Sequence, residues 1–267
     1  MSDWSDVVVR VAGLKTHLLS VEQLRTLARA PDLAALADGL EQAGFPVRVT
    51  VMGASPAALD LAVRRQTGAA LRVLGRWCGS RAAELAVVFE DVDRRNLRVL
   101  LRGLLQGVAP TTRLVGLMPT PALPERALEE LAAQQSGEDM AGLLSIWGSP
   151  FGQPLLAELR MAQPDLFRLE LLLDRTWAER ALAPGAGRDP IIRGFARTSI
   201  DLSNVRSALL LSLQGTDVDI GGVFLPGGDL LQEREFRQAA GAGGPDAALD
   251  VLARGLAPST FAGVLRT

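Results

Sequence analysis

The sequence has one cysteine, one histidine, one lysine and no tyrosine among its 267 residues, and these scarcities exclude several kinds of site. A single cysteine, Cys78, cannot form an intrachain disulfide and is typical of a reducing compartment. With His17 as the only histidine, the chain cannot supply the nitrogen and sulfur ligands of an ordinary zinc site. The only lysine, Lys15, follows leucine rather than glycine, which excludes the Gly-x-x-x-x-Gly-Lys phosphate-binding loop.

Catalytic motifs are also missing. The sequence contains no Gly-x-Ser-x-Gly, and no Gly-x-Gly-x-x-Gly follows a strand-like segment. His17 falls in a predicted first helix among leucines and is predicted to be structural. Glu90, Asp91 and Asp93 could in principle hold Mg²⁺, but the favoured interpretation is that Asp93 caps a helix while the other two are solvated beside the arginines that follow. The sequence therefore predicts no catalytic residue, no cofactor and no metal.

Long apolar runs and a basic surface are lacking too. Although 48% of the residues are hydrophobic, no run of about 18 uncharged apolar residues occurs, so no transmembrane segment is predicted. The first residues, MSDWSD, lack the charged-then-apolar pattern of a secretory leader, and the cytoplasm is the expected compartment. A net charge of −2 with few aromatic residues gives no indication of a surface that binds nucleic acid.

What the sequence does contain is helical periodicity along nearly its whole length. Ser20 and Gln23 have the spacing of a capping box at the start of one helix, and Ser55 followed by Pro56 opens a long one. Residues 48–52 have a short extended pattern. Further helices are predicted over residues 7–19, 32–42 and 165–182. The predicted fold class is all-α.

The strongest signal is an internal repeat. The segment DRRNLRVLLRGLLQG at residues 93–107 returns as DLSNVRSALLLSLQG at residues 201–215, an offset of 108. Seven of the fifteen paired positions are identical, where random pairing would give roughly one. The identical pairs are Asp93/Asp201, Asn96/Asn204, Arg98/Arg206, Leu101/Leu209, Leu105/Leu213, Gln106/Gln214 and Gly107/Gly215. A repeat at a fixed period indicates that the fold is built from similar units.

Other segments follow the same period, so the chain divides into three predicted helical lobes. The segment at Leu123 resembles that at Leu19 at an offset of 104, and the segment at Leu231 follows at an offset of 108. The predicted lobes cover residues 1–115, 116–223 and 224–267. In a third lobe the counterpart of Asp93 would fall near position 309, beyond the last residue of the sequence, so this lobe is predicted to be incomplete.

The candidate site residues, here termed the signature residues, are the polar members of the repeated segment: Asp93, Asn96, Arg98, Asp201, Asn204 and Arg206. Aspartate is a preferred N-cap, because its carboxylate accepts free N–H groups and meets the positive end of the helix dipole. Asparagine at the third helical position can bond back to the cap. We therefore predict that Asp93 and Asp201 begin two core helices. Their leucines, including Leu105 and Leu213, are predicted to form inward-facing apolar stripes.

Several segments together look like the C subunit of bacterial and archaeal V/A-type rotary ATPases, a family that includes the d subunit of the eukaryotic vacuolar enzyme. The segments are RVAGLKTHLL at 10–19, FEDVDRRNLRVLLRG at 89–103, IDLSNVR at 200–206 and Gly-Gly at 227–228. The similarity spans about residues 7–255. The order, spacing and repetition of these segments, rather than any one of them, carry the resemblance.

The resemblance implies three similar helical lobes arranged as a funnel about a pseudo-threefold axis. Such a protein would sit as one copy on the cytoplasmic face of the membrane-embedded proteolipid ring and receive the foot of the central shaft, which is made of the D and F subunits. It would be a non-catalytic rotor subunit without nucleotide or ion of its own, coupling H⁺ or Na⁺ transport to ATP synthesis or hydrolysis. The family's shaft and ring contacts match no motif here, so no partner-binding residue is assigned.

Two other functions stay open on the residues alone. A generic all-α repeat scaffold could bind another protein in a concave surface, although a period near 108 residues is far longer than a solenoid repeat. An enzyme would have to use Glu90, Asp91 and Asp93 with a metal ion. A purified protein that is folded and metal-free would exclude the enzyme.

Overall fold

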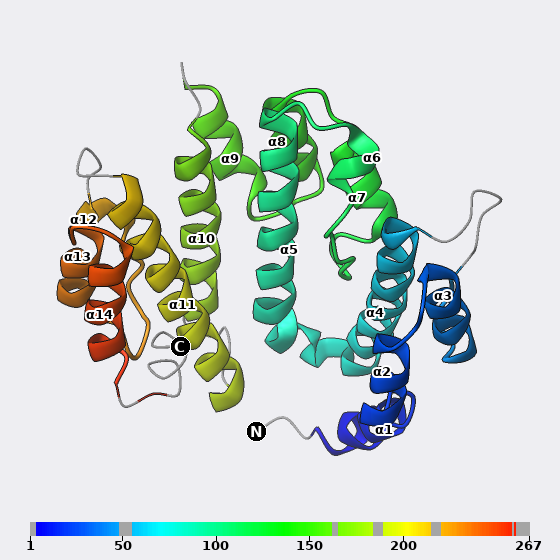
Figure 1. Ribbon diagram of the computed structural model, residues 1–267. Helices are drawn as coiled ribbons and strands as arrows, with labels where there is room; N and C mark the ends of the chain where they lie inside the picture. The colour runs from blue at the N-terminus through cyan, green and yellow to red at the C-terminus, as the bar shows by residue number, and fades with distance from the viewer. Residues whose placement is uncertain are drawn as a thin grey trace. The chain divides into compact units, whose positions relative to one another are not determined.

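The computed structural model describes residues 4–47, 55–161, 165–183, 189–214, 220–257 and 259. Within these ranges every regular element is a helix and none is a strand, which confirms the all-α prediction (Figure 1). The extended segment predicted at 48–52 lies outside the described residues. The chain divides into two compact units, Met1–Arg160 and Met161–Thr267.

The first unit consists of nine described α-helices and one 3-10 turn. They are α1 Ser5–Lys15, α2 Val21–Ala28, α3 Leu33–Gln42, α4 Pro56–Cys78, the 3-10 turn η1 Gly79–Arg81, α5 Ala82–Leu105, α6 Pro110–Arg113, α7 Glu125–Ala132, α8 Gly137–Ile146 and α9 Gly152–Leu159. Ser20 Oγ accepts from the Gln23 N–H at 3.2 Å and the Gln23 side chain accepts from the Ser20 N–H at 2.8 Å, which confirms the capping box. Ser55 likewise caps α4 through the Ala58 N–H, with Pro56 as the first helical residue.

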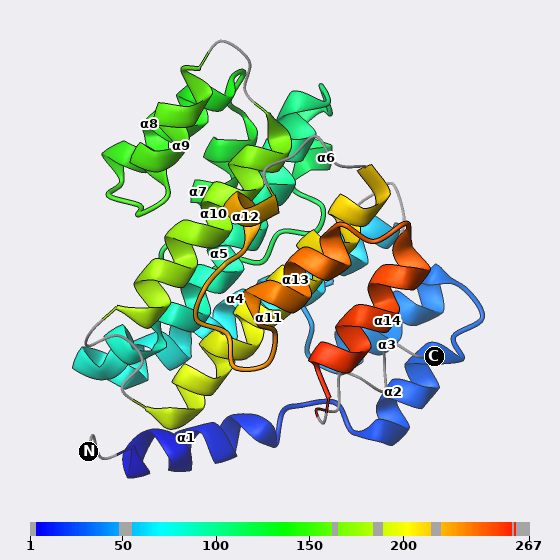
Figure 2. The same cartoon turned by 90° about the vertical axis from the view of Figure 1, so that its left-hand side faces the viewer.

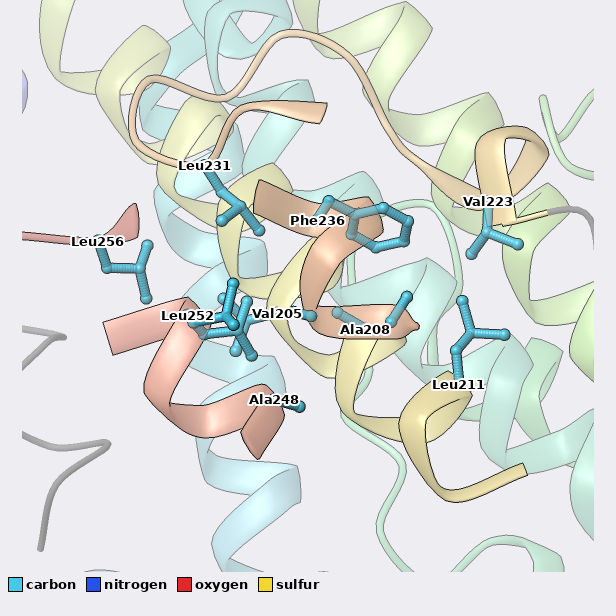
Figure 3. Close-up of a cluster of buried hydrophobic side chains, with 12 residues drawn as sticks. Val205, Ala208, Leu211, Val223, Leu231, Phe236, Ala248, Leu252 and Leu256 are labelled. Carbon is cyan, nitrogen blue, oxygen red and sulfur yellow. The ribbon is translucent and has the colours of Figure 1, made fainter. Parts of the chain in front are cut away.

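The second unit is built around one long helix. Its helices are α10 Leu166–Leu182, α11 Pro190–Gln214, α12 Ile220–Val223, α13 Glu233–Ala240 and α14 Pro245–Gly255. The shorter α13 and α14, drawn in orange and red, lie against α11 (Figure 2). Phe236 of α13, Ala208 of α11 and Leu252 of α14 are fully buried in the cluster that joins the three helices (Figure 3). Alanines at 208, 239 and 248 leave room for the backbones to approach closely.

The sequence repeat reappears in the helix bounds. Helices α7 and α8 begin 104 residues after α2 and α3, and α13 and α14 begin 108 residues after α7 and α8. The long helix α11 begins at Pro190, 108 residues after α5 begins at Ala82. The repeat and the two compact units are different divisions of the chain, and the three lobes 1–115, 116–223 and 224–267 remain a prediction.

The two long helices begin earlier than the sequence analysis predicts. Because α5 starts at Ala82 and α11 at Pro190, Asp93 and Asp201 lie inside helices, and the prediction that they begin them is wrong. The residues before each aspartate already have helical periodicity, and no proline separates them from it. In a helix interior the backbone N–H groups already donate to carbonyls of the same helix. The side chain of an aspartate there must therefore find hydrogen-bond partners elsewhere.

Three residues predicted to be helical and structural, or to face inward, lie at or just after helix ends. His17 follows α1 in an exposed turn, so its predicted helical position is wrong. Leu101 is fully buried as predicted, but Leu105 is 43% exposed and Leu213 is 63% exposed. Both leucines occupy the last turn of a long helix, where the apolar stripe extends past the core that covers its middle.

The close contact between α8 and α9 at Gly152 allows a test of how tightly these two helices pack. A Cβ on Gly152 would lie 2.4 Å from the backbone nitrogen of Ser145, whereas a Cβ on Gly142 would meet no atom within 4 Å. We expect Gly152→Ala to lower the free energy of unfolding by about 1–3 kcal/mol, because the helices must separate. We expect Gly142→Ala, the control inside α8, to raise it by about 0.5–1 kcal/mol through helix propensity. Urea denaturation measures both, and equal effects would contradict the close approach.

Candidate functional site

Two signature residues of α5 bind the loop that leads to α7. Asp93 is 4% exposed, and its Oδ1 accepts a hydrogen bond from the Thr120 hydroxyl at 2.6 Å. Thr120 Oγ1 in turn accepts from the Leu123 N–H at 2.9 Å. Asn96 pairs with both backbone groups of Met118, donating to its carbonyl at 2.7 Å and accepting from its N–H at 2.9 Å. We call Asp93, Asn96, Met118 and Thr120 the first clamp.

The same pattern in α11 binds the loop that leads to α13. Asn204 pairs with both backbone groups of Leu225, donating at 2.8 Å and accepting at 2.9 Å. Asp201 is 2% exposed and accepts three backbone N–H groups, each at 3.0 Å. Its Oδ2 accepts from Asp229 and Leu230, and its Oδ1 accepts from Leu231. We call Asp201, Asn204 and residues 225–231 the second clamp.

The second clamp requires glycine in its loop. A Cβ on Gly228 would lie 2.1 Å from Asp201 Oδ1, far inside van der Waals distance. Gly227 has a φ of 104°, a backbone conformation that favours glycine. The Gly-Gly pair therefore lets the loop backbone pass close enough to the carboxylate for its three N–H groups to reach the oxygens.

The clamps correct the predicted N-cap role of the signature. Asp93 and Asp201 bond to groups 27 to 30 positions further along the chain instead of to the first turn of a helix. Asn96 and Asn204 bond to peptides 22 and 21 positions away. The aspartates and asparagines therefore make tertiary contacts between each long helix and a later loop.

The two signature arginines lie beside the clamps. Arg206 forms an ion pair with Glu170 of α10 at 3.0 Å, and the glutamate is buried. In the second unit the signature thus contacts a neighbouring helix as well as a loop. Arg98, the counterpart on α5, is half-buried.

The two clamp aspartates have different polar surroundings. Burial raises the pKa of Asp93 to about 7 from its ordinary 3.8; the Thr120 hydroxyl opposes this shift and the charge of Glu90 adds to it. Asp93 has one hydroxyl donor, whereas Asp201 has three N–H donors. The first clamp therefore contains a carboxyl group that titrates near neutral pH.

The prediction that Asp91 of the acidic cluster is solvated is wrong. Asp91 is 2% exposed and accepts from Arg94 Nε at 2.7 Å, and it forms an ion pair with Arg95 at 2.6 Å. The carboxylate of Asp91 is thus occupied by arginines, while that of Asp93 is bonded to Thr120. Across the described ranges, no group of three or more His, Cys, Asp or Glu side chains is placed to hold a metal ion.

Both clamps fall within the match to one protein family. The sequence model of the family described as "ATP synthase (C/AC39) subunit" matches residues 7–267. The chain belongs to this family. The resemblance to the C subunit of V/A-type ATPases is thereby confirmed.

Proteins similar to this chain include C subunits of archaeal and bacterial ATP synthases. The C subunit of the A-type ATP synthase of Haloquadratum walsbyi is 26% identical over 242 residues, which cover 86% of this chain and 68% of the relative. That of Haloferax volcanii is 26% identical over 248 residues, covering 88% and 69%. The C subunit of the V-type ATP synthase of Deinococcus radiodurans is 27% identical over 271 residues, covering 96% and 73%.

One further property of this ATP synthase subunit family member concerns membranes. In the part of the chain that the structure describes, no helix has both the length and the apolar character needed to cross a bilayer.

The partners of the signature residues were not predicted from the sequence. The missed residues include Thr120 and Met118 of the first clamp and Leu225 and Gly228 of the second. A signal was present, since each signature asparagine is followed, 22 and 21 positions later, by an apolar residue and a proline. Such a recurrence at nearly constant distance indicates a tertiary contact that is made in each repeat.

A buried arginine in the first unit was also not predicted from the sequence. Arg113 is 7% exposed, and its Nε donates to the Val108 carbonyl at 2.6 Å. Its Nη1 donates to the carbonyls of Ala132 and Gln134 at 3.0 and 2.8 Å. Its side chain packs on Gly103, where a Cβ would lie 2.9 Å from Arg113 Cγ. Arg113 thus joins the end of α5 to the end of α7.

Proposed function

We propose that this chain is a non-catalytic rotor subunit of a V/A-type rotary ATPase. It would lie on the cytoplasmic face of the membrane as one copy per complex and connect the central shaft, made of the D and F subunits, to the proteolipid ring. Transport of H⁺ or Na⁺ by the ring would thereby be coupled to ATP synthesis or hydrolysis elsewhere in the complex. Membership of the ATP synthase (C/AC39) subunit family supports this assembly, as do relatives that are C subunits of A-type and V-type ATP synthases.

The pair of clamps is the observation that best supports a mechanical role. Each clamp fixes the interior of a long helix to the loop that enters the next pair of short helices, α7–α8 or α13–α14. A subunit that transmits rotation must resist displacement of its helices relative to one another. Hydrogen bonds between buried groups at fixed points provide that resistance, because breaking them leaves polar groups unsatisfied in a low-dielectric interior.

A binding assay with purified components tests the proposal. The full chain is titrated separately against the detergent-solubilised proteolipid ring and against the D–F shaft complex, both from the same organism. We expect binding to both, with one copy per ring. A folded chain that binds neither would overturn the rotor role and favour a generic all-α scaffold. Binding to only one of the two would overturn the coupling between shaft and ring.

A further inference from the structure

A groove of about 600 Å³ lies on the pair of short helices α2 and α3, and Val63 of α4 also lines it. Its lining is apolar except for Asp32, whose carboxylate caps α3 through the Ala35 N–H at 2.8 Å. Leu24 is 51% exposed and Leu33 is 39% exposed, although both line the groove. Large apolar side chains left open to solvent around a groove indicate an interaction surface.

The counterparts of these groove residues are buried in the other two copies of the helix pair, α7–α8 and α13–α14. The repeat offsets pair Leu24 with Leu128 and Phe236, which are 2% and 0% exposed. Further positions follow the same rule, because the members in the second and third copies are 0% to 4% exposed while the first is exposed or half-buried: Leu19 with Leu123 and Leu231, Leu27 with Leu131 and Ala239, Ala28 with Ala132 and Ala240, and Leu36 with Met140 and Ala248. The first pair thus presents the same apolar face without a cover.

In the other two copies a long signature helix contacts the pair. Helices α7 and α8 contact α5, and α13 and α14 contact α11. Both long helices have an apolar stripe and the pattern Asp-x-x-Asn, and the clamps bind each of them to the loop before its pair. No stretch of the chain outside the described residues is longer than 260–267, which is far shorter than the 24 residues of α5. These 267 residues therefore supply no third helix of this kind for α2 and α3.

We propose that the groove on α2 and α3 binds a third signature helix, an amphipathic helix with a leucine stripe and the pattern Asp-x-x-Asn, supplied by a partner polypeptide. Its leucines cover Leu24 and Leu33 in the way that α5 and α11 cover the corresponding positions of their own pairs. Burial of leucine side chains stabilises the complex, as it stabilises the two other copies within this chain. The interaction goes beyond the rotor role and does not depend on it.

The turn before α2 determines how the helix lies in the groove. At the offset of 104, Thr16 is the counterpart of Thr120, whose hydroxyl donates to Asp93 at 2.6 Å in the first clamp. Thr16 is exposed, and its hydroxyl donates to the Gly13 carbonyl at 2.7 Å. An exposed hydrogen bond of this kind is exchanged at little net cost. The aspartate of the bound helix therefore accepts the Thr16 hydroxyl, as Asp93 accepts that of Thr120.

The first arm of the test uses α5 itself as the probe. A synthetic, fluorescently labelled peptide of residues 82–107 is titrated with the full 267-residue chain, and we expect saturable binding of one peptide per chain with a gain of helical circular dichroism. The double variant Leu24→Ala, Leu33→Ala should bind the peptide at least about tenfold more weakly. The control is Leu105→Ala with Leu213→Ala, an equal loss of exposed leucine outside the groove, which should change the affinity by less than about threefold.

The outcomes of this arm are distinct. A folded wild-type chain that does not bind the peptide overturns the proposal, as does equal binding of a scrambled peptide of the same composition. Equal losses in both double variants also overturn it, because the effect would then be one of general hydrophobicity. A wild-type chain that dimerises in sedimentation equilibrium, while the Leu24, Leu33 variant does not, would assign the groove to a second copy instead. No other subunit is used, so these outcomes are independent of the test of the rotor role.

The second arm tests the predicted contact at Thr16 with a double-mutant cycle. Thr16→Val in the chain and Asp93→Ala in the peptide should each lower the affinity by about threefold or more, because each removes one partner of the same hydrogen bond. The two changes together should cost little more than either alone. Losses that add in full overturn the proposed position of the helix in the groove. Circular dichroism and thermal unfolding of each variant show whether the fold is kept.

Discussion

Replacing Asp201 with asparagine is expected to lower the free energy of unfolding by about 3 kcal/mol or more. The carboxylate accepts the N–H groups of residues 229–231 with both of its oxygens. An amide offers one oxygen and one NH₂ group, so at least one backbone N–H loses its acceptor and faces another donor. Urea denaturation of the full chain at pH 8 measures the loss, and faster amide hydrogen exchange at Leu231 would localise it.

Asp93→Asn is the matched control for this prediction. Among the residues that the structure describes, Asp93 accepts only the Thr120 hydroxyl, and an amide oxygen can accept the same bond. The substitution also removes a buried charge at pH 8. Its free energy of unfolding at pH 8 should therefore equal or exceed that of the wild type. Equal losses in Asp93→Asn and Asp201→Asn would contradict the difference between the two clamps.

The pH dependence of stability is the second large effect. The pKa of Asp93 is about 7 in the folded chain against an ordinary 3.8, so the folded chain keeps this proton at pH values where the unfolded chain has lost it. The stability that this group contributes is fully present below pH 3.8 and is lost as the pH rises through 7. The loss is on the order of 4 kcal/mol at most.

Free energies of unfolding at pH 5, 6, 7 and 8, from urea denaturation of the wild type and of Asp93→Asn, test this pH dependence. Other carboxyl groups contribute to both chains alike, so the difference between the two curves isolates Asp93. We expect the wild type to lose stability relative to the variant as the pH rises. Curves that stay parallel over this range would show that Asp93 titrates outside it.

Local sequence signals predicted those helix starts whose partners lie within a few residues. The capping box of Ser20 and Gln23 and the cap at Ser55 are present because every atom involved belongs to one turn of chain. The all-α class and the period of 108 also follow from the sequence alone, since both are properties of spacing. These predictions required no knowledge of tertiary packing.

The role of Asp93 and Asn96 depends on tertiary packing, and the predicted N-cap role was therefore wrong. An aspartate that caps a helix and one that is buried within a helix can precede the same residue types, so local pattern does not separate them. The distinguishing signal is spacing: Asp93 and Asn96 fall in register with the apolar stripe of α5, which continues at Leu97. A polar residue inside a buried stripe must have a buried partner, and here the partner is a loop more than twenty positions later.

The different surroundings of the two aspartates could not be predicted from the sequence. The repeat pairs Asp93 with Asp201 as identical residues, yet one meets a threonine hydroxyl and the other meets three peptide N–H groups. The difference comes from the loops, where Thr120 lies in one and Gly227 and Gly228 lie in the other. Only the backbone path of each loop determines how many donors reach the carboxylate.

The buried guanidinium of Arg113 makes one junction of the first unit insensitive to ionic strength. It donates to the carbonyls of Val108, Ala132 and Gln134, which are neutral groups. Dissolved salt weakens exposed ion pairs such as Arg237–Glu233, but it screens buried contacts much less. The connection between the ends of α5 and α7 should therefore persist in brine, a condition that weakens the exposed ion pairs.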